Sequence, residues 1–544
     1  MRAVKESESM KMDLALRNGF LFDGTGNPAV RTDIGVRDGR IARVGRIGEG
    51  EAVRTVDASG LAICPGFIDI HNHVDNGVLA YPSVDSYVMQ GVTTSVTGNC
   101  GASMAPLDDR TIDLSRRYLA PFVPPSEAID WRWRTNAEYM EAIALNGTAQ
   151  NLAFFVGQGT IRIAVKGFSP SAATPDEMDR MRELLRNALD DGCFGLSSGL
   201  IYPPGSFTGE RELLELAGEL APRGAIYATH LRNEGNYLAE SVAEALEIGR
   251  RWNVPVQLSH HKAVGRPNWG KVHHTLRMME EARAKGVDVC CDAYPYTAAS
   301  TTVTSLLPPF AHEGGVAETV RRLRNAEDRL RMAEEIRRKG CQWENWIAGA
   351  GLENIFVSGC AVRPDVEGKH LKEIVDTLYP GREGFDGLFD FLADIECLAT
   401  MIVFAIDEED VKTVLAHPLS CVASDSWAST PSAGGKPHPR GYGTFPRFLR
   451  RYVLDGRLMT LQEGVRKITS MPASRLGLPD RGLLREGFRA DITVFDPERI
   501  RDTATFTDPH HFPEGIPTVV VNGVVVVDDG RLTDKRPGMI LRRA

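Results

Sequence analysis

The sequence predicts an α/β protein built on a large parallel barrel, and three observations support that fold class. Short apolar strands alternate with helical stretches through the middle of the chain, which is typical of a parallel α/β barrel. Both ends of the chain are instead rich in short strands joined by glycine turns. One apolar strand ends in two histidines, as expected at the edge where barrel active sites gather. The 544 residues suffice for one large domain and one or two small ones.

The two β-rich ends of the chain share one pattern of short strands and tight turns. In the first 62 residues we expect strands near 14–16, 34–36 and 41–44, with an Asp38-Gly39 turn. From about residue 481 we expect strands near 491–495 and 518–527, the second broken by the hairpin turn Asn522-Gly523. On composition alone the two ends form either one composite domain or two separate β modules.

The middle of the chain supplies the strands and helices of the barrel. We place its eight strands near residues 63–73, 92–99, 151–157, 194–199, 225–230, 254–260, 287–293 and 420–425. Helices are expected between them at 175–190, 208–221, 236–252 and 271–285. The long segment of about 309–400, with helices within 316–339, is predicted to be a subdomain inserted between strands 7 and 8. The predicted domains are therefore 1–62, 63–480 and 481–544.

Charge and cysteine content narrow the partners and the compartment. A net charge of −9 and a pI near 5.9 argue against nucleic acid or an anionic membrane as partner, which leaves a small molecule. The first residues lack the apolar core of a secretory signal, and no apolar run approaches the ~18 residues of a membrane helix. Nine cysteines without framework spacing indicate reduced thiols and a cytoplasmic location. The oligomeric state is left open.

The segment 63–75 carries the first chemical signal. Alternate residues of a strand share a face, so His71 and His73 should point the same way, roughly 7 Å apart, at the end of the strand. Ile68 and Ile70 should point oppositely and pack on an outer helix. Two histidines alone are compatible with solvent exposure or helix capping. After the strand Pro-Gly-Phe-Ile-Asp-Ile, a metal site is the favoured interpretation.

Further metal-ligand types occur at the ends of three later strands. Cys100 follows the second strand, His230 the fifth and His260 the sixth. A lone buried cysteine is usually a small hydrophobe and a lone histidine usually structural, but their recurrence at strand ends favours a shared cation. A thiolate favours zinc over magnesium or calcium. His261 is a second candidate at the sixth strand, although strand alternation favours His260.

These segments also resemble a known family. PGFIDIHNHVD is similar to the first-strand signature of the amidohydrolase superfamily. GNCG, GLSSGLIYPPG, SHHK, DAYPYT, ASD and HPRGYGTFPR resemble its D-aminoacylase or N-acyl-D-amino-acid deacylase branch, across roughly residues 13–530. The resemblance implies a (β/α)8 TIM-like barrel with a small composite β-sandwich from both termini. It also implies zinc-dependent hydrolysis of N-acyl-D-amino acids to a carboxylate and a free D-amino acid.

The resemblance assigns roles to the residues. It implies a tighter zinc on Cys100, His230 and His260, and a weaker or second zinc site completed by His71 and His73. The general acid and base is Asp425, which by itself could be only a helix cap. The candidates for holding the substrate carboxylate or carbonyl are Arg440, Lys262, Tyr202, Tyr294 and Ser300; an arginine fork suits a planar carboxylate.

The alternatives to this assignment are two other kinds of metal-dependent hydrolase and a non-enzymatic scaffold. The fourth strand has no lysine to carboxylate, which disfavours hydantoinase-like and dihydroorotase-like sites. Related hydrolases of D-residue dipeptides, N-acyl-β-amino acids or cyclic imides share the metal site and stay open. A non-enzymatic scaffold would lack ligands, and none is missing. Asp425 is followed by Ser426 and Trp427, where a glycine often follows the aspartate in this branch, and the bulky Trp427 near the pocket puts the acyl or side-chain preference in doubt.

Overall fold

A parallel sheet of eight strands forms the centre of the molecule in the computed structural model, which describes residues 11–543. The strands neighbour each other in chain order: β6 (Phe67–Asp69), β7 (Val92–Thr97), β8 (Asn151–Gly157), β9 (Gly195–Gly199), β10 (Ile226–His230), β11 (Val256–Leu258), β12 (Val289–Ala293) and β16 (Ser420–Val422). Two backbone hydrogen bonds join the segments after β6 and β16: Asp425 N–H donates to His71 O at 2.8 Å, and His73 N–H donates to Ser426 O at 2.7 Å. The predicted barrel is therefore confirmed.

The side chains of the first barrel strand face the other way from the sequence prediction. Ile68 and Ile70 belong to a buried cluster that includes Phe155 of β8, Ile226 of β10 and Cys421 of β16. Because these strands lie around the whole barrel, the cluster fills its interior, and the prediction that Ile68 and Ile70 pack on an outer helix was wrong. The pairing of β6 with β7 is irregular between Phe67 and Ile68, and β6 ends at Asp69. A regular alternation therefore does not run from Phe67 to His71 and His73.

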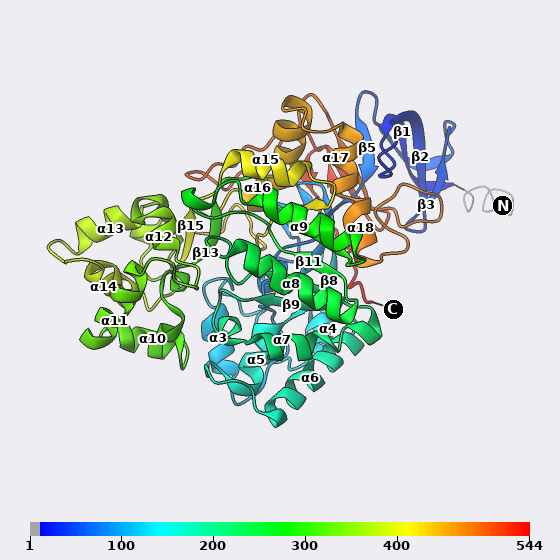
Figure 1. Ribbon diagram of the computed structural model, residues 1–544. Coiled ribbons are helices and arrows are strands. Elements are labelled where there is room, and N and C mark those ends of the chain that lie inside the picture. Colours follow the sequence, from blue (N-terminus) through cyan, green and yellow to red (C-terminus); the bar gives the residue numbers. More distant parts are fainter. Residues whose placement is uncertain (1–10, 544) are drawn as a thin grey trace.

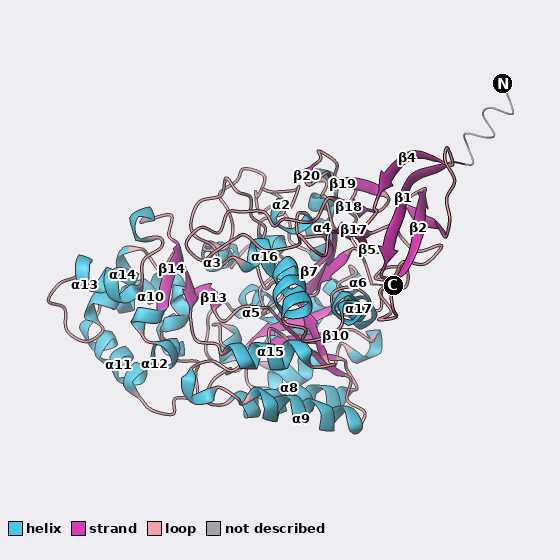
Figure 2. Cartoon of the chain, turned by 90° about the horizontal axis from the view of Figure 1, so that it is seen from above, coloured by secondary structure: helices cyan, strands magenta, loops and turns pink. Residues whose placement is uncertain are grey.

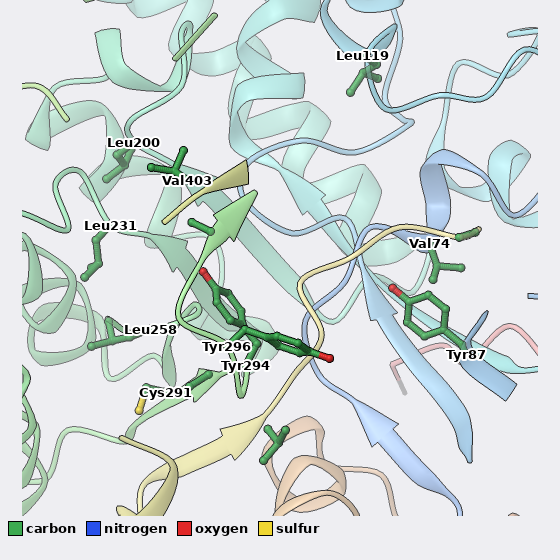
Figure 3. Packing of buried hydrophobic residues seen from close by; sticks show 14 of the residues in the cluster. Val74, Tyr87, Leu119, Leu200, Leu231, Leu258, Cys291, Tyr294, Tyr296 and Val403 are labelled. Carbon is green, nitrogen blue, oxygen red and sulfur yellow. The ribbon is translucent and has the colours of Figure 1, made fainter. Parts of the chain in front are cut away.

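Helices surround the barrel, and local sequence signals mark where α6 begins. The helix α6 (Pro175–Asp190) starts with Pro175 behind a Thr174–Glu177 capping box, which satisfies free N–H groups of its first turn. The other helices of this part are η1 (Val74–Asn76), α2 (Asp85–Val88), α3 (Ile112–Leu119), α4 (Asn136–Asn146), α5 (Gln158–Lys166), η2 (Gly205–Phe207), α7 (Glu210–Ala217), η3 (Ala221–Arg223), α8 (Leu238–Trp252), η4 (Arg266–Asn268), α9 (Val272–Ala284), α15 (Glu408–Ala416), α16 (Arg440–Arg447), η9 (Phe448–Asp455), α17 (Leu461–Lys467) and α18 (Ser470–Leu476). Figure 3 shows Leu258, Cys291, Tyr294 and Tyr296 within the buried core. Among residues 11–543, no helix has both the length and the apolar character needed to cross a bilayer.

Strands from both ends of the chain share one sheet. Its order is β20-β19-β18-β17-β5-β1-β2-β3, and β4 pairs with β1. The strands are β1 (Met12–Leu21), β2 (Val30–Arg37), β3 (Arg40–Val44), β4 (Ala52–Asp57), β5 (Ala62–Pro65), β17 (Ile492–Phe495), β18 (Thr518–Val521), β19 (Val524–Asp528) and β20 (Arg531–Leu532). Leu14, Ile34, Ile492 and Val520 lie in one buried cluster, so the alternative of two separate modules is excluded.

A separate unit occupies the chain between β12 and β16. Its three-stranded sheet has the order β13-β15-β14, formed by β13 (Ala299–Thr302), β14 (Ile355–Gly359) and β15 (Thr400–Val403). Its helices are η5 (Val303–Leu306), η6 (Pro309–His312), α10 (Val316–Leu323), α11 (Ala326–Arg337), α12 (Trp346–Ala350), η7 (Leu352–Asn354), η8 (Pro364–Val366), α13 (Leu371–Leu378) and α14 (Asp386–Asp394). Helices α10–α14 lie at one end of the molecule and strands β1–β3 at the other, with the barrel between them (Figure 1; Figure 2). The unit's sheet begins at Ala299, before the expected boundary near 309.

Candidate active site

Five polar side chains meet where the barrel strands end. Cys100 follows β7, His230 ends β10, and His260 follows β11, while His71 and Asp425 follow β6 and β16. All five are at most 7% exposed. One ligand atom from each of His71, Cys100, His260 and Asp425 lies within 4.8 Å of the others. Residues separated by more than three hundred positions in sequence therefore form one buried cluster.

The distances within the cluster connect all of the predicted metal ligands. Cys100 Sγ lies 3.2 Å from His71 Nε2 and 3.6 Å from His260 Nε2. His260 Nε2 lies 2.8 Å from His230 Nδ1. His73 approaches from the other side, with its Nε2 3.3 Å from Asp425 Oδ1. The structure thus brings together the five residues that the sequence singled out as metal ligands.

The backbone at three of these positions adopts a conformation that is uncommon for residues with side chains. Cys100, His260 and Asp425 have φ values of 52°, 35° and 49°. Non-glycine residues in this region cost of order 1–3 kcal/mol each, and they cluster at functional sites, where the surrounding structure holds them. Each turns its side chain away from the line of the preceding strand and towards the cluster.

Glycines allow the loop that carries Cys100 to pack closely on its neighbours. A Cβ atom on Gly98 would lie 2.1 Å from Phe155 O, and one on Gly199 would lie 2.0 Å from Cys100 O. Neither position can hold a side chain without moving the backbone. The absence of a side chain at each position lets the loop after β7 lie directly against β8 and β9.

The two neighbouring histidines after β11 point to different places. His260 faces Cys100 and His230, as described above. His261 Nε2 instead lies 2.8 Å from Thr275 Oγ1 of α9, and its backbone N–H donates to Asp292 O. The geometry therefore puts His260 in the cluster and His261 on the helix side, although strand alternation, which ends at Leu258, was not a valid reason for that choice.

Two buried carboxylates hold the histidines, and the sequence prediction missed both. Asp292 Oδ1 lies 3.0 Å from His71 Nδ1 and accepts the backbone N–H of His260 at 2.7 Å. Glu234 Oε1 lies 3.0 Å from His260 Nδ1 and 2.7 Å from Lys262 Nζ. Such partners fix the orientation of metal-binding imidazoles. A signal existed for each, since Asp292 also lies near a strand end and Glu234 follows His230 by four residues.

The electrostatics of the cluster favour a positive charge at its centre. Burial raises the pKa of the Cys100 thiol, but the charges of His71 and His260 outweigh it and lower that pKa well below its ordinary value. Burial lowers the pKa of His73, yet its hydrogen bond to Asp425 and the proximity of Cys100 raise it to about 9. A thiolate and imidazoles at these separations are the donor types that zinc prefers. The residues present therefore fit a zinc ion.

Asp425 connects the cluster to an arginine. Its Oδ1 lies 3.3 Å from His71 Nε2, and its Oδ2 lies 2.8 Å from Nη1 of Arg440, which is 1% exposed. Burial raises the pKa of Asp425, but Arg440, His260 and His71 lower it well below its ordinary value. The group is a carboxylate at neutral pH, the form that can accept a proton.

The remaining substrate-binding candidates line the same pocket as the metal ligands. The hydroxyl oxygens of Tyr294 and Ser300 are buried, and neither has a hydrogen-bond partner in residues 11–543. Tyr202 accepts a hydrogen bond from Thr301 Oγ1 at 3.0 Å. Arg440 lies over the Tyr294 ring, 4.6 Å from its centroid. Free polar atoms of this kind are available for a ligand.

An aromatic pair forms another wall of the pocket. The side chain of Trp427 packs against Phe122, with ring centroids 5.4 Å apart, and both line the pocket. The backbone of Trp427 pairs with that of His73 in an isolated parallel bridge. Trp427, noted in the sequence for its bulk beside Asp425, is therefore fixed at the edge of the cluster.

A closed parallel barrel with a thiol, imidazoles and a carboxylate at its strand ends is the architecture of a barrel enzyme with a metal-dependent site. The model of the amidohydrolase family matches residues 54–342 and 391–527. The chain belongs to this family.

Similar proteins share nearly the whole chain. It is 36% identical over 540 residues to a D-aminoacylase of Alcaligenes xylosoxydans xylosoxydans, covering 99% of both chains. It is 37% identical over 542 residues to an N-acyl-D-aspartate deacylase of the same organism, covering 99% of this chain and 97% of that one. Among solved structures, an N-acyl-D-glutamate deacylase of Bordetella bronchiseptica, complexed with zinc and a phosphonate inhibitor that mimics the tetrahedral intermediate, matches with a TM-score of 0.83. That pair is 33% identical, and the match covers 98% of this chain and 100% of the other.

Proposed function

We propose that this protein is a zinc-dependent hydrolase that cleaves N-acyl-D-amino acids into a carboxylate and a free D-amino acid. The observation that carries the proposal is the buried cluster of Cys100, three of the histidines and Asp425 at the mouth of the barrel. The chain is similar over nearly its full length to a D-aminoacylase, an N-acyl-D-aspartate deacylase and an N-acyl-D-glutamate deacylase, which supports the substrate class.

Each predicted ligand has a role in this proposal. Cys100, His230 and His260 hold the tighter zinc, and His71 and His73 complete a weaker site, with Cys100 close enough to serve both. Zinc in such a site acts as a Lewis acid on a carbonyl and lowers the pKa of water from about 16 towards 7. Glu234 and Asp292 keep the imidazoles oriented.

Asp425 moves the proton. Amide hydrolysis joins a water oxygen to the acyl carbon, breaks the carbon–nitrogen bond and needs a proton at the leaving nitrogen. Asp425 accepts the proton from water at its carboxylate and returns it to the amine. Its backbone is tied to His71 across the barrel seam, so the carboxylate stays close to the metal ligands.

The substrate carboxylate is held by residues beside Asp425 and His260. Arg440 donates from its guanidinium fork, and Lys262 adds a second positive charge. The free hydroxyls of Tyr294 and Ser300 supply hydrogen bonds, and Tyr202 lies where it can bind the acyl oxygen or the carboxylate. Trp427 and Phe122 exclude water from that part of the pocket.

The state of the cysteines supports a cytoplasmic location. All nine cysteines are unpaired, as in a reducing cytoplasm.

A metal analysis combined with a panel of N-acetyl-D- and N-acetyl-L-amino acids tests the function. We expect bound zinc, turnover of the D-series, loss of activity with a chelator and its return with zinc. Exclusive turnover of the L-series would refute the stereochemical assignment.

A further inference from the structure

A small second cavity, here called the rear cavity, lies behind the active-site pocket, at the seam between the barrel and the inserted unit. On one side it shares Pro203, Ser305, His312 and Trp346 with the active-site pocket. Pro203 belongs to the loop after β9, and the other three belong to the inserted unit. The rear cavity therefore adjoins the site where hydrolysis is proposed.

The other side of the rear cavity adjoins a groove at the surface, here called the outer groove. The two share Ile201, Pro309, Trp343 and Glu344. Farther out, the groove is lined by polar side chains that include Arg338. The rear cavity therefore shares residues of its wall with both the active-site pocket and the outer groove.

Three buried polar atoms that line the rear cavity have no hydrogen-bond partner in the described part of the chain. They are Nε1 of Trp343, Nε1 of Trp346 and Nε2 of His312. Trp346 is 1% exposed and His312 is 7% exposed. Buried polar groups without partners are rare in folded proteins, because each costs about 1–3 kcal/mol. Three around one cavity indicate an occupant.

The chemistry of these atoms identifies that occupant. An indole N–H is only a donor. Burial lowers the pKa of His312 to about 4, so its ring is neutral at pH 7. Nε2 of a neutral imidazole is a donor or an acceptor according to the tautomer, and it lies beside two indole donors around this cavity.

Water matches this set better than an anion or an apolar group. Water accepts two hydrogen bonds from the indoles and also pairs with His312 Nε2 in either tautomer, because it both donates and accepts, whereas an anion only accepts. The cavity volume of about 10 Å³ is close to the least that holds one water, and buried waters usually have two to four polar partners. An apolar occupant would leave all three atoms unsatisfied.

We propose that the rear cavity binds water and admits it from the outer groove to the active-site pocket while substrate fills the barrel mouth. The inference rests on the proposed function, because hydrolysis consumes one water molecule in each cycle. A bulky acyl group blocks the front opening, so renewal of water from behind matters most for bulky substrates. The rear cavity beside Ser305 and Pro203 is too small for the substrate itself to enter.

The kinetic test uses Ser305→Leu, which fills the junction between the pocket and the rear cavity. Its matched control is Thr304→Leu, because Thr304 lines the active-site pocket but not the rear cavity. For each variant, kcat is measured with an N-acetyl and an N-benzoyl derivative of the same D-amino acid. We expect Ser305→Leu to lower kcat for the N-benzoyl substrate at least about fivefold more than for the N-acetyl one, a difference of ~1 kcal/mol. Thr304→Leu should change both by similar factors.

Equal effects of Ser305→Leu on the two substrates would overturn the proposal. A second test does not depend on that variant folding. A crystal structure of the zinc-loaded wild-type enzyme should show ordered water within hydrogen-bond distance of Trp346 Nε1 and His312 Nε2, and Trp346→Phe should remove it. A dry cavity would overturn the proposal even if the enzyme deacylates D-substrates. Failure of wild-type turnover would count against the proposed function instead.

Discussion

The two sides of the active site are held in place in different ways. On the β10–β11 side, His260 and Lys262 depend on one buried carboxylate, Glu234, which is 0% exposed. On the β6–β16 side, Asp292 likewise orients the His71 side chain, but a backbone hydrogen bond from Asp425 to His71 also joins the two segments, independent of their side chains. Side-chain substitutions should therefore disturb the backbone of the first side more than that of the second.

The largest effect is expected at Asp425, on the β6–β16 side, where a loss of catalysis can be distinguished from a loss of zinc binding. Asp425→Asn keeps the shape but removes the proton acceptor, so kcat should fall by about 10²–10⁴-fold, the usual contribution of a general acid or base. Zinc content should stay near that of the wild type, while the unfolding midpoint should fall, because the buried Arg440 loses its charged partner. Metal analysis, kinetics and denaturant unfolding test this. Near-normal turnover would remove Asp425 from the mechanism.

On the β10–β11 side, Glu234→Gln should lower both the stability of the fold and the affinity for zinc. Loss of the carboxylate leaves the Lys262 ammonium buried without its partner, which costs about 3–5 kcal/mol of unfolding free energy. Zinc affinity should also fall about 10–100-fold, because His260 loses its orienting partner. Chelator competition and urea unfolding measure the two effects.

The double variant Glu234→Gln with Lys262→Met sharpens this result. Removing the unpaired ammonium should restore much of the stability, while zinc affinity stays low because His260 still lacks its partner. If stability and zinc affinity recover together, Glu234 acts only by neutralising Lys262.

A smaller effect is expected at the substrate wall. Arg440→Lys keeps the positive charge next to Asp425 but loses the planar fork, so KM for the D-substrate should rise about tenfold, or ~1.4 kcal/mol. Arg447→Lys is the control, since Arg447 pairs with Asp502 and does not line the pocket. An unchanged KM in Arg440→Lys would argue against a carboxylate clamp.

The smallest effect is expected at His261, and it tests the choice between neighbouring histidines. His261→Asn removes the hydrogen bond to Thr275, at a cost of about 0.5–1.5 kcal/mol of stability, and should leave zinc content unchanged. The corresponding change at His260 should abolish tight zinc binding. Loss of zinc in His261→Asn would reverse the assignment.

The strand ends could be predicted from the sequence because residue type and position agree there. His71, Cys100, His230 and Asp425 are ligand or acid types that directly follow or end apolar strands, and the structure brings them together. The supporting residues were harder to find. Glu234 follows His230 by four residues, but its contacts with His260 and Lys262 become visible only in three dimensions.

Alternation rules failed where strands end early. The orientation of Ile68 and Ile70 was mispredicted because β6 is irregular after Phe67 and stops at Asp69, and the left-handed backbone of His260 breaks the pattern after β11. In the inserted unit, β13 is only four residues long, too short to show a period. The stretch 316–339 contains two helices, since Asn325 caps the start of the second.

The sheet shared by the two termini has a consequence for biosynthesis. Strand β5, which leads directly into the first barrel strand, pairs with β17, and Leu541 donates its backbone N–H to Leu152 of β8. The ribosome releases those partners long after β5 and β8, so the growing chain carries exposed strand edges until they emerge. Removing residues 492–544 would leave those edges permanently open to aggregation.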